Sequence, residues 1–183
     1  RSKLAPNGEK IVMHVSNFRS VKRVEDVVEV FARMKVPEGA RLIMVGDGPD
    51  RPRAARRAAE LGVKDDVVFL GKHISVDELL SCADLFLLPS QTESFGLAAL
   101  EAMACGVPVA AFPVQGPLDV VDHRHSGVLD DDLALAIKGA LQLDRADCIA
   151  AAHAYTWERC TTQFVAHLAA IPGAIQQGGG CRI

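Results

Sequence analysis

The sequence predicts an α/β fold in which a parallel β-sheet carries helices on both of its faces. Short β-branched runs alternate with longer helical stretches, which is typical of βαβ units. The runs are apolar throughout instead of alternating with polar residues, which indicates strands that are covered on both faces. With 183 residues, 49% of them hydrophobic, the chain is long enough to bury one substantial core.

The order of elements follows from these runs. We expect strands over residues 11–15, 41–46, 67–71, 84–89 and 107–112, and helices over residues 24–34, 53–61, 76–81 and 96–104. After residue 112 the pattern changes. "PVQGP" predicts a turn, and residues 131–141, 145–155 and 157–171 have helical periodicity, so we expect helices alone to complete the domain.

Composition limits the classes of partner. We expect a linker at residues 1–10, one domain over residues 11–170 and a flexible, glycine-rich tail at residues 171–183. The net charge of −3 gives no general attraction to nucleic acid or to anionic membranes. Neither a transmembrane run nor a signal peptide is visible, and the five cysteines form no CxxC pair. These features predict a cytoplasmic protein with no nucleic-acid partner.

The first candidate site residues follow the first two expected strands. Ligands of an open parallel sheet bind outside the carboxyl ends of its strands. "SNFRSVKR", at residues 16–23, places Arg19 and Lys22 where they are able to face a diphosphate. "VGDGP", at residues 45–49, includes Gly46, which lets the backbone approach a ligand. A solvated helix start and a plain turn are the alternatives for these two segments.

A second group surrounds "PSQTESFGLAALEAMACGVPV" at residues 89–109. The expected helix begins near Gly96, so the free N–H groups at Gly96 and Leu97 form an anion site at the edge of the sheet. Glu101 lies on this helix among Ala, Leu and Met, where an unpaired buried carboxylate costs on the order of several kcal/mol. Sugar hydroxyls would satisfy Glu101, as would solvent or an internal salt bridge. Glu93, in the preceding loop, is its companion.

Nothing in the sequence predicts a metal site. "HRH", at residues 123–125, lacks a carboxylate or thiol at a ligand spacing, so we expect a surface loop there. His14 is expected to end the first strand and, because it lies near the cations, is a minor candidate for the site. Tyr155 and Trp157 are expected to anchor packing near the C-terminus.

Four segments in a fixed order carry a resemblance to a known family. They are "SNFRSVKR", "LIMVGDGP", "VVFLGK" and "ADLFLLPSQTESFGLAALEAMACGVPV". From about residue 11 to about residue 168 the chain resembles the C-terminal, donor-binding domain of retaining glycosyltransferases of family 4. The most specific element is the pair Glu93 and Glu101, separated by seven residues around "SFG". The resemblance implies a Rossmann-like domain, the C-terminal half of a GT-B glycosyltransferase.

The resemblance also implies an activity and roles for four side chains. Family members are hexosyltransferases that move a glycosyl unit from a nucleotide diphosphate sugar to an acceptor, with retention at the anomeric carbon. Arg19 and Lys22 resemble the pair that neutralises the donor diphosphate. Glu101 resembles the carboxylate that accepts hydrogen bonds from the ribose, and Glu93 resembles the group that holds hydroxyls of the transferred sugar.

Backbone groups complete the site that the resemblance implies. The N–H groups around Phe95, Gly96 and Leu97 resemble those that bind the distal phosphate. The backbone near Lys72 and His73 is similar to the segment that reads the edge of the base. In such families arginine, lysine and a helix N-terminus stabilise the leaving diphosphate, so we expect no metal and no cofactor besides the donor substrate.

Two departures from the family pattern leave the donor and the acceptor open. The N-terminal, acceptor-binding domain is absent from these residues, so we expect this chain alone to bind donor and to transfer little or nothing. Up to about residue 108 the chain is most similar to the subfamily that attaches N-acetylglucosamine to malate in bacillithiol synthesis, which favours a UDP-sugar over a GDP-sugar. Later residues resemble other bacterial members, and residues 116–119 read "GPLD" where that subfamily is expected to have a "GG.PE" type of turn.

Other classes of function remain. The main alternative is a non-catalytic, stand-alone nucleotide-binding or interaction module, for which the reading frame upstream of Arg1 would lack a second α/β domain. A dinucleotide-dependent dehydrogenase is disfavoured, because no GxGxxG follows the first strand.

Overall fold

The computed structural model describes residues 1–34 and 39–168, and within them it confirms the α/β fold with a six-stranded, wholly parallel sheet. The strands are β1 (Lys10–Val15), β2 (Ala40–Val45), β3 (Val67–Gly71), β4 (Leu85–Leu88), β5 (Val109–Ala111) and β6 (Gly127–Leu129). Their order across the sheet is β3-β2-β1-β4-β5-β6. The expected tail at residues 171–183, with Cys181, lies outside the described residues.

Helices cover both faces of the sheet. On one face α1 (Val24–Arg33), α2 (Arg51–Glu60) and α6 (Leu133–Ala140) enclose one apolar cluster. On the other face α3 (Val76–Leu80), α4 (Leu97–Ala104), α5 (Pro117–Val120) and α7 (Arg145–Ala152) enclose a second cluster. Successive strand residues point to opposite faces, so Met13 joins one cluster and Val12 the other. Burial on both sides explains why the strands are apolar throughout.

The expected strands and the long helices are confirmed to within a few residues, but the expectation that only helices follow residue 112 is wrong. There β6 has only three residues, Gly127–Leu129, and it forms by pairing with β5. The helix α5, of four residues, was also not predicted. Both elements are too short to show a periodicity of their own. Two 3-10 turns, η1 (Ser20–Lys22) and η2 (Lys64–Asp66), complete the described segments.

The sheet reverses its winding direction between β1 and β4. From β1 the chain moves outward through β2 to β3, and it then returns to place β4 on the other side of β1. The chain after β1 leads to α1 on one face, whereas the chain after β4 leads to α4 on the opposite face. Loops that diverge in this way open a crevice at the carboxyl ends of the two strands, where ligands bind in open α/β sheets.

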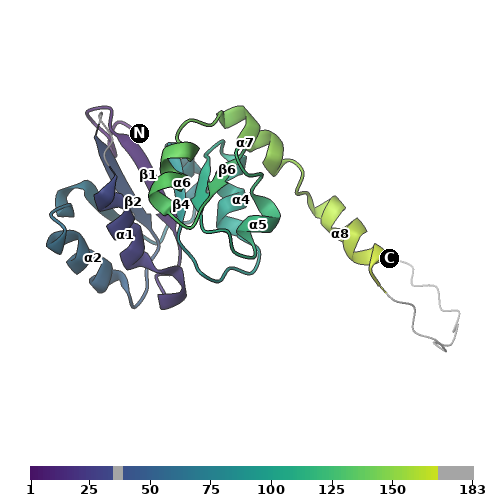
Figure 1. Cartoon of the computed structure of the whole chain (residues 1–183), viewed down its shortest axis with the longest axis horizontal. Helices are drawn as coiled ribbons and strands as arrows, with labels where there is room; N and C mark the ends of the chain where they lie inside the picture. The colour runs from purple at the N-terminus through teal and green to yellow at the C-terminus, as the bar shows by residue number, and fades with distance from the viewer. Residues whose placement is uncertain (35–38, 169–183) are drawn as a thin grey trace, which may run out of the picture.

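The two ends of the described chain differ in their packing. Residues 1–9, which belong to the linker expected at residues 1–10, lie at the amino ends of β1 and β4, where Ala5 is buried and Arg1 forms an ion pair of 2.8 Å with Asp84. The helix α8 (Trp157–Ala166) extends away from the domain (Figure 1). Trp157 is 89% exposed, so its expected role as a packing anchor is wrong, whereas Tyr155 packs against the core. No helix among the described residues is long and apolar enough to span a membrane.

Candidate functional site

Two predicted site residues meet at the crevice between β1 and β4. Lys22, in the loop after β1, donates a hydrogen bond of 2.5 Å from Nζ to Oε2 of Glu93, in the loop after β4. The two residues are 71 positions apart in the chain. Their side chains are only 22% and 15% exposed, so water screens this ion pair less than a surface pair. The crevice therefore contains a cation and a carboxylate in direct contact.

A buried histidine holds the loop that carries Lys22. His14 is fully buried near the end of β1, with Nδ1 2.9 Å from the Leu87 carbonyl oxygen of β4 and Nε2 2.8 Å from Oγ of Ser16. A carbonyl oxygen only accepts, so Nδ1 carries the proton and Nε2 accepts from the Ser16 hydroxyl. The backbone N–H of Phe18 donates to the same Oγ at 3.3 Å. This chain of hydrogen bonds connects β4, β1 and the loop.

The protonation state of His14 follows from its surroundings. Burial is the main cause that lowers the pKa of His14 from 6.5 to about 4, and the positive charge of Lys22 lowers it further. The Leu87 carbonyl, which accepts a hydrogen bond from the ring, acts in the opposite direction. His14 is therefore neutral near pH 7, as its hydrogen bond from Ser16 requires.

The same loop includes an unusual backbone conformation at Phe18. Phe18 is fully buried and has φ of 40°, in the left-handed region that side chains rarely adopt. Its ring stacks on His14 with 6.3 Å between the ring centroids, and it meets the edge of Phe69 at 6.4 Å. A left-handed residue costs about 1–2 kcal/mol, which these buried contacts offset. The loop before Arg19 and Lys22 is thus fixed by its packing.

Close packing of two loops explains the glycines of "VGDGP". A Cβ atom at Gly46 would lie 1.8 Å from the Ser16 carbonyl oxygen, and one at Gly48 would lie 2.1 Å from the Asn17 carbonyl oxygen. The backbone N–H of Asp50 donates to the Phe18 carbonyl oxygen at 3.0 Å, which fastens the loops together. Gly46 is therefore needed where the loops meet, and its predicted contact with a donor stays a prediction.

The loop after β4 leads into a helix with an uncapped N-terminus. Gly96, with φ of 85°, precedes α4, and no side chain caps this end within the described part of the chain. The N–H groups of Ala99 and Leu100 bond to the Gly96 carbonyl oxygen, which leaves the N–H of Leu97 at the open end of the helix. Phe95 makes an edge contact with Tyr155 at 6.1 Å between ring centroids. This end of α4 has the N–H groups and the dipole that bind anions.

Gly116, in the turn that the sequence predicts, supports Glu93. Gly116 has φ of 91°, and a Cβ atom there would lie 3.0–3.2 Å from the carbonyl oxygen, Cβ and Cγ of Glu93. The stem of Glu93 therefore lies directly on the Gly116 backbone, which keeps its carboxylate toward Lys22. The turn at residues 116–119 was the signal in the sequence, although nothing there indicated its contact with Glu93.

The structure decides between the alternatives for Glu101, which were solvent at the helix edge, sugar hydroxyls and an internal salt bridge. Leu97, Glu101 and Ala104 form an exposed face of α4, with Leu97 60% exposed. Solvent at the helix edge therefore satisfies Glu101, one of the alternatives for this residue, and no hydrogen bond to its carboxylate occurs among the described residues. The apolar helix surface still desolvates the carboxylate in part and raises the pKa of Glu101. The carboxylate is open to a ligand one turn after the start of α4.

The remaining candidates lie on the same edge without contacting this group. Lys72 and His73 are exposed after β3, which is separated from β1 by β2. Arg19 is exposed and has no ion-pair partner among residues 1–34 and 39–168. The same residues contain no group of three or more His, Cys, Asp or Glu side chains arranged to hold a metal ion. In the "HRH" loop, His125 instead pairs with Asp122 at 3.2 Å.

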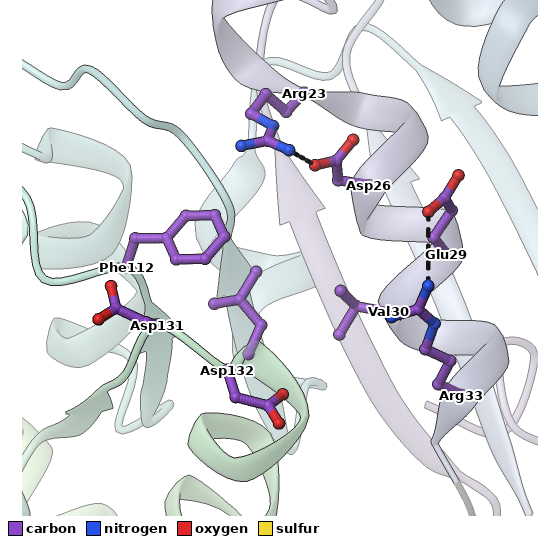
Figure 2. A pocket seen from close by; sticks show the side chains of 9 residues that line it. Arg23, Asp26, Glu29, Val30, Arg33, Phe112, Asp131 and Asp132 are labelled. Carbon is purple, nitrogen blue, oxygen red and sulfur yellow. Dashed lines mark ion pairs between the residues drawn. The ribbon is translucent and has the colours of Figure 1, made fainter.

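A pocket of about 410 Å³ lies between α1 and the start of α6 (Figure 2), and its lining includes Arg23, the residue that follows Lys22. The Arg23 guanidinium is 5.7 Å from the centroid of the Phe112 ring and also pairs with Asp26. Asp132 accepts a hydrogen bond from the backbone of α6 at 2.9 Å. This pocket includes none of the predicted site residues, and several of its charges are already paired within the protein.

Comparison with known proteins gives one family. Residues 1–152 match the family model described as "Glycosyl transferases group 1". N-acetyl-alpha-D-glucosaminyl L-malate synthase of Bacillus anthracis is 50% identical over 121 residues, which are 66% of this chain and 32% of that protein. D-inositol 3-phosphate glycosyltransferase of Stackebrandtia nassauensis is 37% identical over 136 residues, 68% of this chain and 31% of that protein. The chain thus spans about a third of the length of these relatives.

A solved structure shows the same fold. The crystal structure of Anabaena Alr3699/HepE in complex with UDP and glucose superposes with a TM-score of 0.76 at 24% identity. The match covers 91% of this chain and 52% of that one.

Proposed function

The chain belongs to the glycosyl transferases group 1 family, and from this premise we propose that it is the donor-binding domain of a retaining glycosyltransferase that uses a UDP-sugar. The observation that supports this function most is the contact of Lys22 with Glu93 at the crevice between β1 and β4. A cation suited to phosphate there meets a carboxylate suited to sugar hydroxyls. A nucleotide sugar presents these two kinds of group on neighbouring parts of one molecule.

The diphosphate binds between the loop after β1 and the N-terminus of α4. Lys22 and Arg19 provide fixed positive charge, and the N–H groups around Phe95, Gly96 and Leu97 provide oriented dipoles. Negative charge develops on the diphosphate as the bond to the anomeric carbon breaks. Preorganised charges and dipoles at that position stabilise the transition state without reorganising, so the residues suffice for this step without a metal.

The two carboxylates act on different hydroxyl groups of the donor. Glu93 accepts hydrogen bonds from the transferred sugar, because it lies beside the cation that binds the phosphate next to that sugar. Glu101 accepts hydrogen bonds from the ribose, and its exposed carboxylate on α4 is free to do so. The base lies toward the carboxyl end of β3, where Lys72 and His73 follow the strand.

The relatives support UDP as the nucleotide. The relative from Bacillus anthracis, 50% identical, is named for an N-acetylglucosaminyl product, and the Anabaena structure contains UDP and glucose. The acceptor binds to a second domain beyond these residues, in keeping with the third of each relative that the chain matches. This chain alone therefore binds donor without completing transfer, and it does so in the cytoplasm.

Calorimetric titration tests this function. We expect UDP and UDP-N-acetylglucosamine to bind the chain and GDP and GDP-mannose to bind more weakly. Failure of all four to bind would contradict the donor site. Under the alternative, a non-catalytic module, the reading frame upstream of Arg1 lacks a second α/β domain, and the protein binds UDP without releasing sugar from UDP-N-acetylglucosamine.

A further inference from the structure

We propose that Glu93 determines specificity by competing with the donor's diphosphate for Lys22, so that the site prefers an intact nucleotide sugar to the free nucleotide diphosphate. The inference rests on the proposed donor site. It gives a role to the ion pair between Lys22 and Glu93, which exists in the site without ligand and which a nucleotide must break when it binds. The pair then favours the substrate and opposes the product of transfer.

The geometry makes Glu93 the fixed member of the pair and Lys22 the movable one. The stem of Glu93 lies against the Gly116 backbone, so closely that a Cβ atom added to Gly116 would be only 3.0–3.2 Å from Glu93, and the stem cannot withdraw on that side. Lys22 is the last residue of the three-residue turn η1 and has a flexible four-carbon stem with three donors. A phosphate that binds Lys22 therefore turns the ammonium group away from a carboxylate that stays in place.

Removing Lys22 leaves an unpaired carboxylate. The Glu93 side chain is 15% exposed, so water compensates its charge poorly once the 2.5 Å hydrogen bond to Lys22 is broken. The phosphate also brings further negative charge toward the same carboxylate. Free UDP therefore binds a cation but leaves Glu93 without a hydrogen-bond partner. This loss reduces the affinity of the site for UDP.

The sugar of an intact nucleotide sugar supplies the hydrogen bonds that Glu93 has lost. Its hydroxyl groups donate hydrogen bonds to Glu93 while the phosphate takes Lys22, so both members of the broken pair obtain new partners. Once the sugar has been transferred, Glu93 loses the hydrogen bonds from the sugar hydroxyl groups and competes again for Lys22. The same contact therefore weakens the hold on UDP after transfer and favours its release.

The Glu93→Gln variant tests the competition directly, because it removes the charge and keeps the shape of the side chain. The dissociation constants of UDP and of UDP-N-acetylglucosamine are measured by calorimetry for the wild type and for E93Q. We expect UDP to bind E93Q about threefold tighter or more, the gain from freeing Lys22 of a partly screened pair. UDP-N-acetylglucosamine gains nothing or binds more weakly, so the preference for the sugar nucleotide falls.

Two matched variants separate this effect from a general change of charge. Glu25→Gln breaks the ion pair of 2.7 Å between Glu25 and Arg53 on the surface of α1 and α2, and it should leave both constants unchanged. In the background of K22Q, the E93Q substitution should no longer tighten UDP binding, because no lysine remains to be freed. The double variant K22Q/E93Q is therefore compared with K22Q alone. Thermal unfolding of each variant confirms that it is folded, and Glu93→Asp, whose shorter side chain draws the carboxylate away from Lys22, replaces E93Q if needed.

The outcomes decide between the possibilities. Tighter UDP binding by E93Q that depends on Lys22 supports the competition. Equal weakening of UDP and UDP-N-acetylglucosamine by E93Q, or a gain that persists without Lys22, overturns it while the donor site itself stands. A wild-type chain that binds neither nucleotide overturns the donor site and, with it, this inference.

Discussion

The buried His14 should make the stability of this domain depend on pH in a defined direction. Its pKa is lowered from 6.5 to about 4 in the folded chain, so between these values the unfolded chain binds the proton more readily. The contribution of neutral His14 to the stability of the domain is therefore fully present above about pH 6.5, and it is lost as the pH falls toward about pH 4. His14→Gln removes the titrating ring, and its amide retains groups that donate and accept hydrogen bonds.

The magnitude follows from the two pKa values. At about 1.4 kcal/mol per pKa unit, the complete effect is about 3 kcal/mol, and lowering the pH from about 7.5 to about 5 realises about 2 kcal/mol of it. Urea-induced unfolding of the wild type and of H14Q at these two pH values measures the difference. We expect the wild type to lose about 2 kcal/mol more than H14Q on acidification.

A control isolates the buried ring from other groups that titrate in this range. His73 is exposed, so His73→Gln is the matched histidine substitution outside the core. Equal losses in the wild type and in H14Q would refute the assignment of a neutral, buried His14 that accepts a hydrogen bond from Ser16.

Two further substitutions test the loop packing and the proposed ribose contact. Gly46→Ala forces a Cβ atom to within 1.8 Å of a carbonyl oxygen at φ of 120°, so we expect chemical denaturation to show a loss of about 3 kcal/mol or more. Gly62→Ala, at φ of 73° in open space, should lose only about 1 kcal/mol, and equal losses would contradict the loop contact. Glu101→Ala should raise the calorimetric dissociation constant of UDP about tenfold without changing stability, because an exposed carboxylate loses only its ligand. Unchanged UDP binding would remove Glu101 from the site.

The sequence predicts most of the fold because the strands buried on both faces are recognisable by their apolar runs alone. It does not predict β6, since three residues in a polar neighbourhood become a strand only through pairing with β5. The exposure of Trp157 was likewise invisible, because helical periodicity indicates an apolar stripe without showing what that stripe contacts. The resemblance to glycosyltransferases, based on four short segments, is confirmed by the family model over residues 1–152.

The candidate site could be predicted as a location but not as a set of contacts. Topology alone assigns the residues that follow β1 and β4 to one crevice. The contact of Lys22 with Glu93, 71 positions apart, depends on how both loops fold over the sheet. The support of Glu93 by Gly116 and the hydrogen bonds of His14 also join distant segments, and only the tertiary structure brings these together.

The titration of this chain with UDP-N-acetylglucosamine and UDP tests the central claim most directly, because it asks whether the crevice is a donor site without requiring an acceptor. We predict that both nucleotides bind at one site, that UDP-N-acetylglucosamine binds more tightly, and that UDP displaces it. A chain that is folded by thermal unfolding and binds neither nucleotide would contradict the account.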